Sequence, residues 1–132
     1  MAPDGQVEQS SEVVSQLKRV SAAMTRIYKE QFGRGPERVH SHYAGRDAII
    51  CFLENTLTPV ERTLGTLDEH QRLRDMRMLF QYAAEQEFRG AVEEITGRKV
   101  VAFVSGIDTH ADVASEVFTL EPRGLDGAGG RQ

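Results

Sequence analysis

The chain has 132 residues, of which 39% are apolar and 27% are charged, a composition that argues against a disordered protein and suits one globular domain. The formal net charge of -4 argues against a general nucleic-acid-binding protein, which needs a basic surface to neutralise phosphates. The single cysteine, Cys51, rules out an intramolecular disulfide, and no apolar run is long enough to span a membrane. We therefore expect a cytoplasmic protein that does not insert into a membrane.

The two ends of the chain are predicted to be flexible tails. Residues 1–10 are polar, and residues 122–132 (PRGLDGAGGRQ) are rich in glycine, so neither segment can bury enough apolar surface to offset the entropy lost on ordering. Residues 11–121 are predicted to form a single domain, because this length suits one hydrophobic core.

The first predicted element is a long helix that Ser10 or Ser11 caps. Gly33 suits the left-handed conformation that ends helices, and Pro36 prevents the helix from resuming. Apolar residues recur in this segment with a heptad-like four-three spacing, and further apolar residues widen the stripe into a face that suits packing on a sheet. We expect the chain to be a homodimer with this stripe at its interface, formed by Val13, Leu17, Val20, Met24 and Ile27.

Two strands follow this helix and are predicted to pair as a hairpin. The segment ERVHSHY (residues 37–43) alternates, with His40 and His42 on one side of the strand and less polar residues on the other. Residues 44–47 can form a turn, and AIICFL (residues 48–53) follows as a nearly all-apolar strand. Cys51 lies inside this strand, so we expect a buried and unreactive thiol.

The second half of the chain repeats the order helix, strand, strand. Thr58 and Glu61 have the spacing of a capping box, and the pattern from about 68 to 96 predicts one helix more than about 40 Å long, which exceeds the needs of a small sheet. KVVAFVSG and DVASEVFTL are predicted to form a second hairpin around the polar turn IDTHAD. The prediction is an α+β fold of order α-β-β-α-β-β, with two long helices packed on one face of a four-stranded, mainly antiparallel sheet.

Three groups of residues are candidate sites. The Gly-rich loop around Arg34 follows a helix, whereas phosphate-binding loops precede one, so a helix end is the favoured interpretation. His40, His42 and His110 are weak metal candidates: His40 and His42 have a spacing that zinc sites use, but a site needs at least three ligands and no further His or Cys lies near them in sequence. Exposed histidines are the favoured interpretation, and neither a metal nor a cofactor is expected.

Arginines near the start of the second helix are the best candidates for contact with an anion or an acidic partner, although a solvated charged face is the favoured interpretation. These residues, together with the loop arginine, are Arg34, Arg72, Arg74 and Arg77. The sequence offers no evident pair of a nucleophile and a base, which covalent catalysis requires, so we do not expect an enzyme.

Four segments taken together resemble the MpsC-like family of small bacterial domains. They are FGRGP, FLENTLTPVERTL, AVEEITGRKVVAFVSGID and ASEVFTLEP, and the resemblance covers residues 13–122. The family carries the label of a Na⁺-translocating, membrane-potential-generating system, so the resemblance implies association with a membrane ion-transport system and a membrane-protein partner. It transfers no catalytic residue, and the matching positions are Gly33, Gly35, Pro36, Leu57, Thr58, Glu61, Gly97, Val100, Val117, Phe118 and Leu120.

The functional expectation is a non-enzymatic interaction or regulatory domain that docks on a partner. The alternative is a sensing domain that binds a small molecule or an anion, either at the dimer cleft or between helix and sheet. In that case the candidate arginines would contact the ligand.

Overall fold

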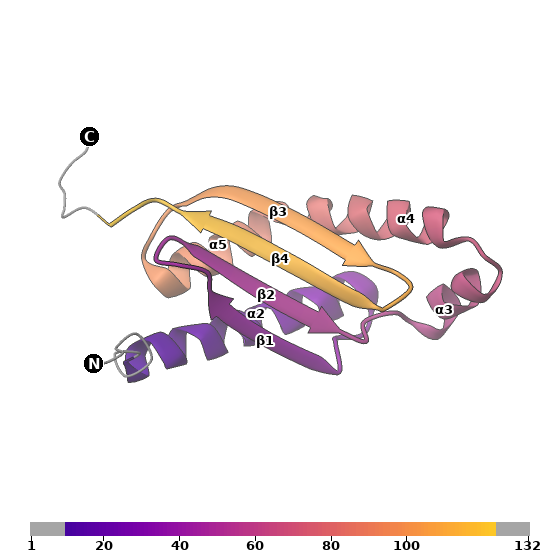
Figure 1. Cartoon of the computed structure of the whole chain (residues 1–132), viewed down its shortest axis with the longest axis horizontal. Coiled ribbons are helices and arrows are strands. Elements are labelled where there is room, and N and C mark those ends of the chain that lie inside the picture. Colours follow the sequence, from indigo (N-terminus) through magenta and orange to yellow (C-terminus); the bar gives the residue numbers. More distant parts are fainter. Residues whose placement is uncertain (1–9, 124–132) are drawn as a thin grey trace.

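The computed structural model describes residues 10–123, so the predicted tails lie outside the described residues apart from Ser10, Pro122 and Arg123. Figure 1 shows two layers, with the sheet in front and the helices behind it. In chain order the elements are α2 (Ser11–Phe32), β1 (Arg38–Tyr43), β2 (Ala48–Glu54), α3 (Pro59–Thr66), α4 (His70–Ala83), α5 (Glu85–Thr96), β3 (Val100–Asp108) and β4 (Val113–Leu120).

The four strands form one sheet in the order β1-β2-β4-β3, and all neighbouring strands are antiparallel. β2 and β4 are therefore the central strands, while β1 and β3 form the edges. The predicted α+β fold, with helices on one face of an antiparallel sheet, is confirmed.

The predicted helix ends are confirmed. The Ser10 side chain accepts a hydrogen bond from the first turn of α2, and Thr58 and Glu61 form the reciprocal capping box of α3. Gly33 and Gly97 end α2 and α5 in the left-handed conformation, with φ of 85° and 71°. Local side-chain chemistry and backbone freedom thus determine where these helices begin and end.

The second long helix is not continuous, which corrects the prediction of one helix over residues 68–96. α4 ends at Ala83 and α5 begins at Glu85, with Ala84 between them at φ -94° and ψ 10°. α4 packs mainly against β3, whereas α5 packs mainly against α2. The break at Ala84 thus separates two segments that pack on different elements.

The apolar core lies between the sheet and the helices and corrects the predicted dimer interface. Val20, Met24 and Ile27 are fully buried against the core within the single chain, so these three side chains are not available to a partner. Val13 and Leu17 are half-buried. A heptad-like stripe looks the same in sequence whether a sheet of the same chain or a second helix covers it.

Gly90 inside α5 and Gly97 at its end provide a matched test of how backbone conformation affects stability. We expect Gly97→Ala to lower the free energy of unfolding by about 1 kcal/mol, because Gly97 has positive φ. Gly90→Ala should raise it by up to about 1 kcal/mol, because Gly90 is helical and an added Cβ meets open space. Urea denaturation measures both values, and equal signs would contradict the left-handed assignment.

Candidate functional site

One face of the sheet is not covered by any helix of the described chain (Figure 1). Strand pairing aligns His42, Ile50, Val117 and Val104 in one row across all four strands. Val104 is 57% exposed. Three of the four residues in this row are apolar, so this surface, here called the open face, can bury apolar area against a partner.

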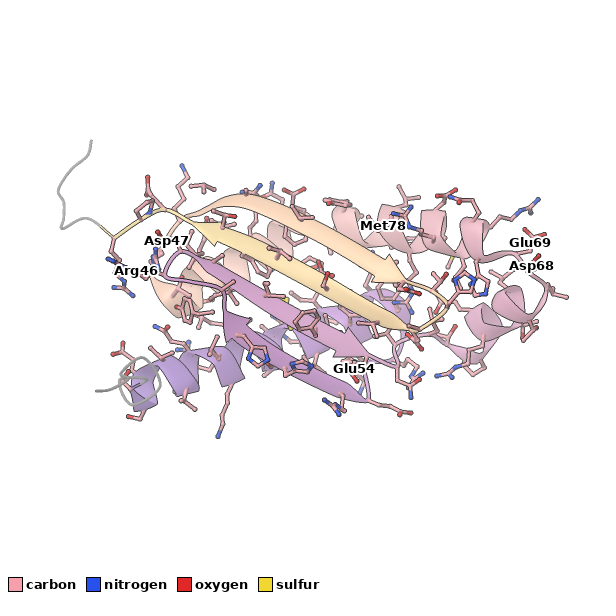
Figure 2. All side chains as sticks on the ribbon, in the orientation of Figure 1. Arg46, Asp47, Glu54, Asp68, Glu69 and Met78 are labelled. Atoms are coloured by element: carbon pink, nitrogen blue, oxygen red, sulfur yellow. The ribbon has the colours of Figure 1, made fainter. Side chains whose placement is uncertain are left out.

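The predicted metal residues do not assemble into one site. His40 and His42 lie on the β1 side of the open face, where His40 Nδ1 is 2.8 Å from His42 Nε2. His40 Nε2 is 3.2 Å from a carboxylate oxygen of Glu54, which Figure 2 labels at the end of β2. His110 instead stacks on His70, with ring centroids 3.6 Å apart. Within residues 10–123, no three His, Cys, Asp or Glu side chains are placed to hold a metal ion.

The other side of the sheet contains a set of polar side chains in the core, here called the buried polar cluster. It has two parts: an ion pair that joins α3 to α4, and a group of hydrogen-bonding side chains around the Glu116 carboxyl on β4. Its members are Tyr28, Glu61, Arg77, Gln81, Ser105 and Glu116.

Arg77 is fully buried, which corrects its predicted place in a surface patch. Its Nε donates to Glu61 Oε2 at 2.8 Å, and its Nη2 donates to Glu61 Oε1 at 2.6 Å and to the Thr56 carbonyl at 2.9 Å. The guanidinium carbon also lies 3.6 Å from the centroid of the Phe32 ring. Burial alone would raise the pKa of Glu61, but the hydrogen bonds from Arg77 and Thr58 hold it below its usual value. Glu61 and Arg77 are therefore a charged pair.

Glu116 lies on the central strand β4 and is also fully buried. The Tyr28 hydroxyl donates to its Oε2 at 2.6 Å, and Gln81 Nε2 donates to Ser105 Oγ at 2.6 Å and lies 3.4 Å from the same Glu116 oxygen. Burial raises the pKa of Glu116 to about 8 and also raises the pKa of Tyr28. Glu116 is therefore mainly protonated at neutral pH, unlike Glu61.

Among residues 10–123, three buried atoms of this cluster find no hydrogen-bond partner: Arg77 Nη1, Gln81 Oε1 and Glu116 Oε1. Arg77 and Gln81 lie one turn apart on α4, and Gln81 contacts Glu116. Because Glu116 Oε2 accepts from Tyr28, the proton of the neutral carboxyl lies on Oε1, so these three atoms are two donors and one acceptor. Sequence reasoning missed Gln81 and Glu116, although the alternation of β4 places Glu116 between the inward residues Ala114 and Phe118.

The other candidate arginines do not form one patch. Arg34 Nη1 donates to the Leu57 carbonyl at 2.5 Å, and Arg34 Nη2 lies 3.4 Å from Glu37. Arg72 pairs with Glu69 at 3.1 Å. Arg74 is exposed and, within the described residues, forms no ion pair.

Cys51 is buried, as predicted. Burial raises the pKa of its thiol to about 12, so the thiolate form is scarce at neutral pH. Among residues 10–123, no helix combines the length and the apolar character needed to cross a membrane.

Comparison with known proteins gives one family and one relative. The family described as "Na⁺-translocating membrane potential-generating system (MpsC)" matches residues 14–122. The uncharacterized protein YrhF of Bacillus subtilis (strain 168) is 26% identical to this chain over 97 residues, which cover 73% of this chain and 80% of YrhF. No solved structure matches the chain.

Proposed function

Because the chain belongs to the MpsC family, described as a Na⁺-translocating membrane potential-generating system, we propose that it is a non-enzymatic cytoplasmic domain of such a system, which docks on a protein partner through the open face of its sheet. The observation that carries the proposal is the row of apolar side chains across that face, formed by Ile50, Val117 and Val104. Burying such side chains against a partner contributes roughly 25 cal/mol per Å² of apolar area.

A partner could also dock by adding a strand to a free edge of the sheet. At the β3 edge, side chains of the chain itself oppose this mode, which favours docking on the open face. The backbone N–H of Ser105 donates to the Tyr82 hydroxyl at 3.0 Å. The Val100 N–H donates to Glu93 Oε2 at 2.9 Å, and the Val100 carbonyl accepts from Arg89 Nη1 at 3.0 Å. These side chains occupy backbone groups that an added strand would need, so a partner strand cannot pair along this edge without displacing them.

The titratable groups support a binding role rather than catalysis. The Cys51 thiol is buried with a raised pKa, and the Glu61 carboxylate is occupied by its bidentate contact with Arg77. A nucleophile must be accessible and activated by a neighbouring base or a lowered pKa, and neither group has these properties.

A pair of matched substitutions tests the docking surface. Val104 on the open face and Val60 on α3 are both exposed, at 57% and 76%, so Val104→Glu and Val60→Glu add the same charge to different surfaces. In a bacterium from which the gene has been deleted, we expect the wild-type chain and Val60→Glu to restore the membrane potential, measured with a voltage-sensitive dye. Val104→Glu should fail to restore it while retaining the wild-type melting temperature.

Two outcomes would contradict the proposal. Full restoration by Val104→Glu would exclude the open face as the docking surface. A deletion that leaves the membrane potential unchanged would exclude the role in that system.

A second candidate function, sensing of a small molecule, is favoured by one observation. An open groove of about 500 Å³ lies between α2 and β1, and its lining includes Leu17, Lys18, His40 and His42. A rise in melting temperature with an inorganic anion such as pyrophosphate, abolished by Lys18→Ala, would support this function, since a ligand that binds only the native state stabilises it.

A further inference from the structure

Helix α4 has an unusual distribution of polar and apolar side chains. Its buried side carries Arg77 and Gln81 next to Leu73, and all three are fully buried. Its exposed side carries Leu79 and Phe80, which are 68% and 41% exposed. A helix at the surface of a domain normally turns its apolar side toward the core. The contacts of α4 within the described chain therefore leave Leu79 and part of Phe80 exposed.

Three exposed residues, Leu79, Phe80 and Ala83, together with the half-buried Met76, form a stripe, here called the α4 stripe. Their spacing of i, i+3, i+4 and i+7 is the spacing with which two helices pack side by side. Phe80 is held against the domain by its edge contact with Phe32, at 6.3 Å between ring centroids. Figure 1 shows α4 at the margin of the molecule, beside the end of β3.

Charged residues stand at both ends of the stripe. Arg72 lies one turn before Met76, and Glu87 lies one turn after Ala83. Arg72 contacts Glu69, which Figure 2 labels near the start of α4, whereas Glu87 forms no ion pair within the described residues.

Two α-helical hydrogen bonds involve Ala84, the residue between α4 and α5. The Ala84 N–H donates to the Phe80 carbonyl at 3.3 Å, and the Phe88 N–H donates to the Ala84 carbonyl at 3.0 Å. Both are the hydrogen bonds between residues four apart that define an α-helix. By sequence spacing, Arg72 and Glu87 fall on the helical side of the α4 stripe, and the two hydrogen bonds preserve this spacing across Ala84.

These two charges are symmetric about the centre of the stripe. Arg72 lies seven residues before Leu79, and Glu87 lies seven residues after Phe80. If a second copy packs antiparallel about this centre, Arg72 lies opposite the partner's Glu87, and the twofold axis forms the same pair a second time. A parallel arrangement would instead bring like charges together.

From the exposed stripe and its symmetric charges, we propose that two copies of this chain form a homodimer in which α4 packs antiparallel on α4. This inference is independent of the docking function of the open face, which lies on a different side of the sheet. One pair of short helices is a small interface compared with the roughly 800 Å² per partner of a standard complex, so we expect a weak dimer, with a dissociation constant in the micromolar range.

Sedimentation velocity of the purified full chain, over concentrations spanning the micromolar range, tests this proposal. The wild-type chain should change from monomer to dimer with concentration, and Leu79→Glu should remain monomeric. Val104→Glu, which alters only the open face, should dimerise like the wild type. Arg72→Glu and Glu87→Arg should each weaken the dimer about fivefold to tenfold, and the double variant should restore it, because both symmetric pairs then re-form with reversed charges.

Each alternative outcome overturns a defined part of the proposal. A wild-type chain that stays monomeric, or a Leu79→Glu variant that still dimerises, excludes the α4 stripe as the interface. Loss of the dimer in Val104→Glu alone assigns self-association to the open face. Failure of the charge-reversed double variant to regain the dimer, with its melting temperature unchanged, excludes the antiparallel arrangement.

Discussion

Replacing Arg77 by methionine should lower the free energy of unfolding by about 3–5 kcal/mol, because it leaves a buried carboxylate without its counter-ion. Arg77 is fully buried and contacts both carboxylate oxygens of Glu61 at 2.6 and 2.8 Å. It also donates to the Thr56 carbonyl. Methionine retains an unbranched apolar chain, so the loss reports mainly on the missing charge and hydrogen bonds rather than on a cavity.

Urea denaturation at neutral pH measures this effect, with Arg26→Met as the matched control. Arg26 pairs with Glu30 on the surface of α2, where both side chains are more than half exposed, so its loss should change the free energy of unfolding by at most about 0.5 kcal/mol. The double variant Arg77→Met, Glu61→Leu should regain part of the loss, because it removes both charges. A loss below about 1 kcal/mol in Arg77→Met would contradict a buried ion pair.

Glu116 should make the protein less stable as the pH rises from about 4.5 to about 8. Burial raises the pKa of Glu116 from its usual 4.5 to about 8 in the folded protein. Between these values the folded chain keeps a proton on Glu116 that the unfolded chain has released, so a rise in pH favours unfolding. The contribution of Glu116 is fully present below pH 4.5 and is lost as the pH approaches 8, a change on the order of 4 kcal/mol.

The Glu116→Gln variant isolates this effect from the other titrating groups. A glutamine cannot ionise, can accept the hydrogen bond from Tyr28 through its amide oxygen, and carries an N–H donor where the neutral Glu116 carries its O–H. The stability of the wild type relative to Glu116→Gln, measured by urea denaturation at several pH values, should therefore decrease from pH 4.5 to 8. Glu30→Gln, on the exposed surface of α2, is the control. A wild-type minus Glu116→Gln difference that stays constant with pH would contradict the raised pKa.

Local signals in the sequence determined the elements of this fold. Gly33 and Gly97 end helices because they tolerate positive φ, and Thr58 with Glu61 begins one because their side chains satisfy free backbone N–H groups. Each of these interactions joins residues within a few positions of one another, so the sequence itself contains both partners. The alternation in the strands and the order of the elements likewise predicted the α+β sheet.

Only the tertiary structure shows which residues far apart in the sequence contact one another. Arg77 looked like part of a basic surface, and only the packing of α3 on α4 brings it to Glu61 in the core. Tyr28 and Glu116 are 88 residues apart in sequence and meet across the helix and sheet layers. The stripe on α2 matched a dimer seam equally well, and only the sheet behind it makes Met24 a core residue. Periodicity shows that a side is apolar, but which surface covers that side depends on contacts between segments far apart in the chain.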